Sequence, residues 1–109
     1  MYARVAQYQV QPDKYDQFVE ALNSALPLMR KQEGFQALLV LRVEGSHPPD
    51  VRVMTIWNTQ LSLRQSENNL YFYQAVARAL VLAQGFPTIR EEEVVVHDFP
   101  RLSSSAAKA

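Results

Sequence analysis

The chain has 109 residues and no cysteine, and its eleven lysines and arginines balance eleven aspartates and glutamates to a formal net charge of zero. A chain of this length forms one domain with its own core, and the missing cysteines exclude disulfides, thiolate metal sites and thiol nucleophiles. A zero balance with scattered basic residues argues against nucleic acid as a partner. We expect one domain over residues 1–100 and a flexible tail over residues 101–109, in a cytoplasmic protein that neither spans nor binds a membrane.

The N-terminal third predicts a strand followed by a helix. Bulky and β-branched residues recur from Tyr2 to Val10, which is typical of a strand. Apolar residues at intervals of three and four then indicate a helix over residues 12–32. Pro27 predicts a kink or a restart in this helix, and Gly34 provides its C-terminal cap.

The rest of the chain predicts two strands, a broken helix and a last strand. Residues 35–43 are apolar nearly throughout, and a loop rich in glycine and proline separates them from a second strand over residues 51–58. A helical pattern follows, divided into a short and a long piece around residues 67–69 and ended by Gly85. The sequence VVVHDF at residues 94–99 predicts the final strand.

This order of elements predicts an α+β fold, the ferredoxin-like βαββαβ arrangement, with two helices on one face of a four-stranded antiparallel sheet. The other face of the sheet then needs a cover, because the strand over residues 35–43 carries Leu39 and Leu41 on one side and Leu38 and Val40 on the other. An exposed apolar sheet of this size is unusual for a monomer. We therefore expect a homodimer whose sheets pack face to face.

Two short motifs carry a family resemblance. The turn QEGF at residues 32–35 and the segment VMTIWNTQLSL at residues 53–63, together with the element order, resemble the antibiotic biosynthesis monooxygenase family over about residues 2–99. The resemblance implies a dimeric α/β barrel built from two ferredoxin-like subunits. It also implies one of several activities, since the family includes cofactor-independent oxygenases of polyketide tailoring, quinol oxygenases and haem-degrading enzymes.

The residues that define the active sites of this family differ here. When the motifs are placed in register, Gln7, Ser66 and Val76 stand where the haem-degrading branch has Asn, Trp and His. Without that His the iron has no axial nitrogen, so haem is not expected. Val53 stands where the polyketide-tailoring branch has an Asn, and Asn58 where the family favours an acid after the strand-ending Trp.

The resemblance implies a substrate pocket between the second helix and the sheet, and four residues are candidates for it. Trp57 can stack on a planar ligand and donate its indole N–H, or it can be part of the core. Gln7 is polar on an otherwise apolar strand face, which requires a partner or ligand if it is buried, or an edge position in contact with water. Tyr73, with Val76 on the same helix, is the best cavity-lining tyrosine, and a plain core position is its alternative.

The other polar candidates favour structural roles. Arg4 and Tyr8, in opposite phase to Gln7, are expected to face the dimer interior. His47 lies in a loop and His97 on the last strand, and neither has a second ligand at a suitable spacing, so no metal site is predicted.

Two functional hypotheses remain open. The first is a cofactor-independent monooxygenase that uses O₂ to oxidise a small aromatic, polyketide-like or quinol substrate, with no cofactor bound. The second is a non-catalytic dimer of the same fold, which binds a small apolar or aromatic ligand or has a structural role only.

Overall fold

The computed structural model of the chain describes residues 1–98. Residues 99–109, and with them the predicted tail over residues 101–109 and the end of the predicted final strand, lie outside the described part. The four strands β1 (Tyr2–Gln9), β2 (Phe35–Arg42), β3 (Asp50–Trp57) and β4 (Thr88–Glu93) form one antiparallel sheet in the order β2-β3-β1-β4. This is the predicted ferredoxin-like βαββαβ topology.

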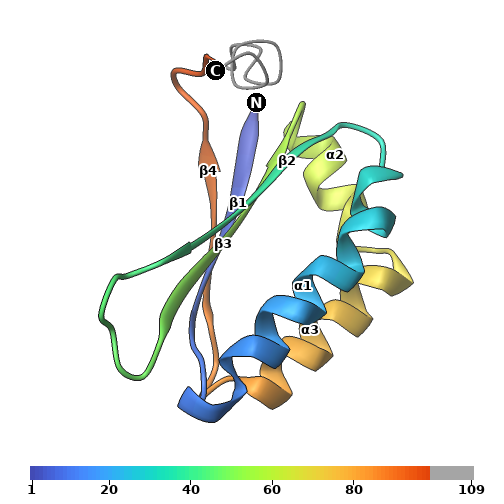
Figure 1. Ribbon diagram of the computed structural model, residues 1–109. Coiled ribbons are helices and arrows are strands. Elements are labelled where there is room, and N and C mark those ends of the chain that lie inside the picture. The colour runs from blue at the N-terminus through green and yellow to red at the C-terminus, as the bar shows by residue number, and fades with distance from the viewer. Residues whose placement is uncertain (99–109) are drawn as a thin grey trace, which may run out of the picture.

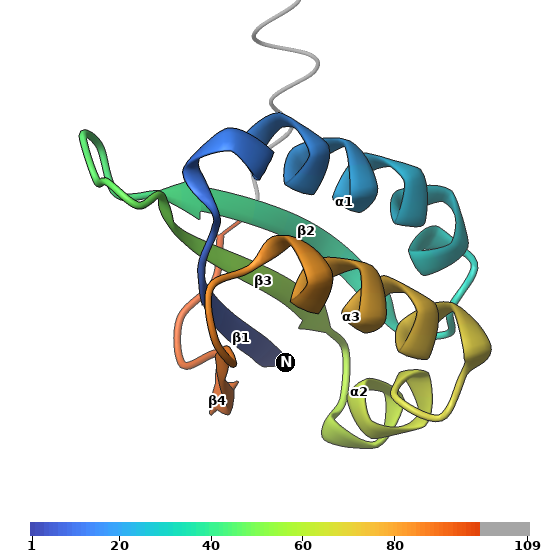
Figure 2. The ribbon, with the colours of Figure 1, turned by 90° about the horizontal axis from the view of Figure 1, so that it is seen from below.

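All the helices cover the same face of this sheet (Figure 1). They are the single 3₁₀ turn η1 (Pro12–Lys14) and the α-helices α1 (Tyr15–Arg30), α2 (Gln60–Ser66) and α3 (Leu70–Leu82). Figure 2 shows α1 and α3 side by side along the sheet, with α2 at one end. Within residues 1–98, no helix has the length and apolar character that crossing a membrane requires.

The first helix is continuous, which corrects the expected interruption at Pro27. Its buried residues Phe18, Ala21, Ala25 and Met29 recur at intervals of three and four along one face. Pro27 lies inside the helix near its C-terminal end, where its missing N–H removes one backbone hydrogen bond while the packed face stays intact. The helix does not restart after Pro27. The α-helix spans Tyr15–Arg30, within the predicted residues 12–32, and the 3₁₀ turn Pro12–Lys14 precedes it directly.

The last strand is Thr88–Glu93, and the prediction of a strand over residues 94–99 is wrong. The short connection after α3 brings Thr88 to Gln7, and the two strands pair antiparallel from there to Glu93 opposite Tyr2. Because the edge of β1 is filled by these residues, the described part of the apolar segment after them is left outside the sheet. The N–H of Val94, the first residue of this segment, donates to the carbonyl of Met1 at 2.9 Å. Charged side chains on an edge strand also discourage pairing with a further strand.

Apolar side chains cluster on both faces of the sheet. On the helix-covered face, Tyr8 packs edge-on against Phe18 with ring centroids 5.2 Å apart, within a core cluster of Ala6, Tyr8, Val10, Phe18, Val51, Ala79 and Ala83. On the open face a smaller cluster is formed by Ala3, Val5 and Ile56. Leu39 and Leu41 extend this open face along β2, and both are more than 40% exposed.

Candidate functional site

A cavity of about 50 Å³ lies between the helix-covered face of the sheet and helices α1 and α3. Side chains of β1 and β3 form its floor, and the first turns of α3 with the end of α2 form its roof. Its walls are mainly apolar and aromatic, with a few polar groups. The lining residues are Arg4, Ala6, Tyr8, Leu22, Met29, Val53, Thr55, Trp57, Ser66, Tyr71, Phe72, Ala75, Val76 and Ala79.

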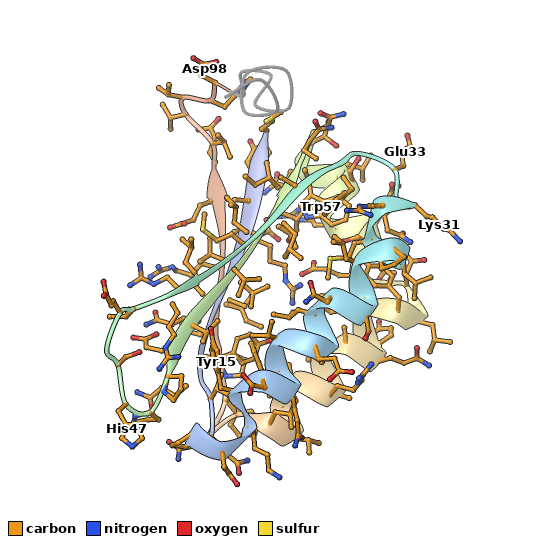
Figure 3. The ribbon with its side chains drawn as sticks, in the orientation of Figure 1. Tyr15, Lys31, Glu33, His47, Trp57 and Asp98 are labelled. Carbon is orange, nitrogen blue, oxygen red and sulfur yellow. The ribbon has the colours of Figure 1, made fainter. Side chains whose placement is uncertain are left out.

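Trp57 forms a fixed wall at one end of this cavity. It is the last residue of β3 and only 2% exposed, and Figure 3 shows it in the space between the sheet and the helices. Its indole N–H donates to Thr55 Oγ1 at 3.0 Å, and its ring meets Phe35 edge-on at 5.4 Å between centroids. Because the N–H already has an acceptor, Trp57 offers a ligand its ring surface rather than a free donor.

Arg4 is the charged residue of the cavity wall. Its side chain is 14% exposed, and its Nε lies 3.2 Å from Oε2 of Glu67 at the end of α2. The guanidinium carbon also lies 4.0 Å from the centre of the Phe72 ring, a cation–π contact. Burial lowers the pKa of Arg4, and the negative charge of Glu67 acts against this shift.

The Nε–H of Arg4 has no well-directed acceptor. Its contact with Glu67 is close enough for an ion pair, but its direction is not that of a hydrogen bond. Among the side chains of residues 1–98, Arg4 Nε is the one fully buried nitrogen or oxygen without a hydrogen-bond partner. A buried donor of this kind carries a free-energy cost that a suitable acceptor would remove.

Two tyrosines stand near Arg4 and are held neutral by their surroundings. Burial raises the pKa of Tyr8, and the positive charge of Arg4 acts against this shift. Burial also raises the pKa of Tyr71, against the opposing effects of Ser66 and Arg4. At neutral pH both hydroxyl groups therefore keep their protons and can donate hydrogen bonds.

The structure corrects the predicted position of Gln7. Gln7 lies on the open face of the sheet, where its Nε2 donates to Asp50 Oδ1 at 3.1 Å, while Arg4 and Tyr8 point to the helices and line the cavity. The expected phase of β1 was therefore reversed, because both alternating sets of this strand contain apolar residues. The signal that could have decided the phase is Val10, which continues the set of Tyr8 and is fully buried.

Tyr73 also lies outside the cavity, whereas Val76 lines it as predicted. Tyr73 is 57% exposed. The expected stripe joined Tyr73 to Val76, but the side of α3 that faces the sheet runs through Phe72, Val76 and Ala79. Phe72 and Val76 are four residues apart, which places them on one side of a helix. The aromatic residues of α3 that reach the cavity are therefore Tyr71 and Phe72.

Metal ions in proteins are held mainly by His, Cys, Asp and Glu side chains, and the arrangement of these side chains determines whether a site can form. No group of three or more His, Cys, Asp or Glu side chains is arranged to hold a metal ion within the described range. His47 lies in the loop between β2 and β3, at the other end of the sheet from Trp57 (Figure 3). His97 is exposed beyond β4.

Comparison with known proteins identifies the family. Residues 1–78 match the family described as antibiotic biosynthesis monooxygenase. The chain belongs to this family. No protein of curated function matches the chain.

Solved structures share the fold of this antibiotic biosynthesis monooxygenase family member at low sequence identity. A conserved protein of Methanosarcina mazei has 21% identity and a TM-score of 0.77, with 84% of this chain and 90% of that protein covered. A protein of unknown function from Nitrosomonas europaea has 21% identity and a TM-score of 0.75, with 91% and 93% covered. A mutant of SnoaB, a cofactor-independent oxygenase from Streptomyces nogalater, has 14% identity and a TM-score of 0.75, with 92% and 97% covered.

Proposed function

We propose that this member of the antibiotic biosynthesis monooxygenase family is a cofactor-independent monooxygenase that acts on a small aromatic, polyketide-like or quinol substrate in the cavity beside Trp57. One observation carries the proposal. The cavity combines aromatic walls, from Trp57, Tyr71 and Phe72, with a buried cation, Arg4. Family membership supports the reaction class, and the fold shared with a cofactor-independent oxygenase is consistent with it.

The proposed reaction needs a substrate that supplies its own electrons. An activated CH₂ group loses a proton, the resulting carbanion transfers an electron to O₂, and the two radicals combine to a hydroperoxide anion, which takes up a proton. Loss of water then leaves a carbonyl, so that R₂CH₂ and O₂ give R₂C=O and H₂O. The protein contributes a dry apolar enclosure and a positive charge that favours the substrate anion.

The size of the cavity limits what can bind without rearrangement. A volume of about 50 Å³ holds about two water molecules. An aromatic substrate therefore has to displace a side chain of the wall. Tyr71 and Phe72 are suited to this movement, because they are only partly buried and lie in the first turn of α3, whereas Trp57 is held by Thr55 and Phe35.

The proposal includes a homodimer formed through the open face of the sheet. Leu39 and Leu41 are 43% and 47% exposed there, next to the apolar cluster of Ala3, Val5 and Ile56. Exposed leucines beside an apolar cluster are typical of an interface. Analytical ultracentrifugation tests this part, and a stable species of 12.5 kDa, the mass of one chain, would contradict it.

A second candidate function is a non-catalytic dimer that binds a small ligand or has a structural role. The small cavity favours this reading, as does the indole N–H of Trp57, which is already bonded to Thr55. The residues that the resemblance leads one to expect are also missing: Val53 stands in place of the Asn of the polyketide-tailoring branch, and Gln7, Ser66 and Val76 in place of those of the haem-degrading branch. Under this alternative no substrate consumes O₂ faster with the protein than without it.

Oxygen uptake separates the two candidates. The purified protein is mixed with a panel of anthrone-type and quinol substrates, and O₂ consumption is compared with protein-free controls. We expect turnover that falls in Trp57→Phe, which shortens the wall of the cavity, and that is retained in Tyr73→Phe, a matched aromatic change outside the cavity. No turnover across the panel, together with identical behaviour of Trp57→Phe and the unmodified protein, would favour the non-catalytic dimer.

A further inference from the structure

The guanidinium of Arg4 is a positive charge that the fold leaves only partly neutralised. In the register of β1 and β4 its direct neighbour is Glu91. The carboxylate of Glu91, however, accepts hydrogen bonds from Gln60 at 3.1 Å and from Arg64 at 3.4 Å. Glu67 is then the remaining carboxylate in contact with Arg4, and its own side chain is 31% exposed.

The Arg4–Glu67 pair is unequal in burial and direction. Arg4 is buried against the ring of Phe72, while Glu67 is the C-cap residue of α2, directly after Ser66, which lines the cavity. Glu67 reaches Nε at 3.2 Å without forming a directed hydrogen bond. A buried cation is stable when an anion meets it with good geometry, and guanidinium groups prefer two parallel hydrogen bonds to a carboxylate. Exchange of the Glu67 carboxylate for another anion costs little, because Glu67 is already partly solvated and the incoming anion compensates the buried charge of Arg4.

We propose that Arg4 is the anion-binding residue of the cavity, and that its ligand is a small aromatic anion, a ring bearing a carboxylate or phenolate oxygen. The anionic oxygen takes the position of the Glu67 carboxylate against Arg4, and the ring lies against the aromatic walls formed by Trp57 and Phe72. The hydroxyl groups of Tyr8 and Tyr71 line the same cavity and can donate to a second acceptor of the ligand.

This inference rests on the proposed function in taking the same cavity as the substrate site, and it adds the chemical class of the substrate. A phenolate oxygen held at Arg4 raises the electron density of the ring that the proposed reaction oxidises, whereas a carboxylate held there only anchors the ring. Binding, however, can be measured without turnover, so the two proposals can fail separately.

Binding of benzoate, followed by intrinsic fluorescence, tests the assignment. Trp57 is the single tryptophan of the chain, so a change in its emission reports on this cavity. Benzamide is the control ligand, because it has the same shape without the charge. We expect a saturable change with benzoate, and at least about tenfold weaker binding of benzamide, since a hydrogen bond to a charged group is worth more than a neutral one.

Three variants refine the test. Arg4→Met removes the charge and should weaken benzoate binding by about tenfold or more. Glu67→Gln removes the internal competitor and should strengthen benzoate binding by about threefold or more, because the free protein then carries an uncompensated buried cation. Arg78→Met is the matched control, since Arg78 is an exposed arginine of α3 that does not line the cavity, and it should bind like the unmodified protein.

The results that overturn the assignment are equally specific. Equal binding of benzoate and benzamide, or weaker binding of benzoate in Glu67→Gln, contradicts it, and both can be measured even if Arg4→Met does not fold. If binding depends on charge but no oxygen is consumed, the anion-binding role of Arg4 is supported and the proposed monooxygenase activity is contradicted. If oxygen is consumed and the KM is unchanged in Arg4→Met, the anion-binding role of Arg4 is contradicted and the monooxygenase activity is supported.

Discussion

Replacing Gly34 with alanine tests the turn that joins α1 to β2. Gly34 has a φ of +82°, and a Cβ atom added to it would lie 2.5 Å from Ser62 Oγ and 2.6 Å from Ser62 Cβ. The left-handed conformation costs an L residue about 1–2 kcal/mol. The contact with a Cβ atom adds to this, because relieving it requires the backbone of α2 to shift. We expect Gly34→Ala to lower the free energy of unfolding by roughly 2 to 4 kcal/mol in total.

Gly45→Ala is the matched control for this prediction. Gly45 has a φ of +72°, and nothing lies within 4 Å of its added Cβ atom, so only the conformational cost of about 1–2 kcal/mol applies. Urea denaturation followed by Trp57 fluorescence gives both losses. Ser62→Gly, introduced together with Gly34→Ala, should recover the steric part relative to Ser62→Gly alone. Equal losses for Gly34→Ala and Gly45→Ala would refute the close contact between the turn and α2.

Three further predictions concern the open sheet face, a buried hydroxyl and a helix cap. Leu39→Arg should convert the proposed dimer to a folded monomer in sedimentation experiments, while Leu61→Arg, on the exposed side of α2, should not. Burial raises the pKa of Tyr71 above its ordinary value of 10.0, so the unfolded chain ionises at lower pH than the folded one. Stability is therefore complete below about pH 10 and falls as the pH rises through the raised pKa, and Tyr71→Phe should reduce this fall in the urea midpoint. Thr59 Oγ1 accepts a hydrogen bond from the N–H of Ser62 at 3.0 Å and so caps α2. Thr59→Ala should therefore lower the free energy of unfolding by about 1 kcal/mol. An unchanged urea midpoint would contradict this role of Thr59.

The order of elements could be predicted because each one has its own local signal. The buried side of α1 repeats at intervals of three and four residues, and the break between α2 and α3 falls at residues 67–69 as expected. The last strand could not be found in the same way. VVVHDF has the stronger intrinsic preference for a strand, but the connection after α3 is short and delivers Thr88–Glu93 to the edge of β1 first. The last strand is therefore set by which segment can pair with β1, and this pairing outweighs the higher local strand propensity of residues 94–99.

The cavity was harder to predict than the fold, because a shift of one residue in a strand reverses which side chains face it. Both alternating sets of β1 are largely apolar, so the sequence could not show that Arg4 and Tyr8 face the helices while Gln7 faces outward. The rotation of α3 was ambiguous for the same reason, since three consecutive aromatic residues begin it and only Tyr71 and Phe72 reach the cavity. Trp57 could be expected inside, because it ends an apolar strand that the helices must cover, whereas Val76 was assigned to the cavity together with Tyr73, which lies outside it.

The fate of the two atoms of O₂ distinguishes a cofactor-independent monooxygenase from a protein without this activity. The chelator-treated protein is incubated with an anthrone-type substrate under ¹⁸O₂, with the protein-free reaction and Tyr73→Phe as controls. The account predicts consumption of O₂ above the protein-free rate, one labelled oxygen atom in the ketone product and the other in water, and a loss of this rate in Trp57→Phe. A rate equal to the protein-free reaction, or a product oxygen that comes from water, would contradict the account.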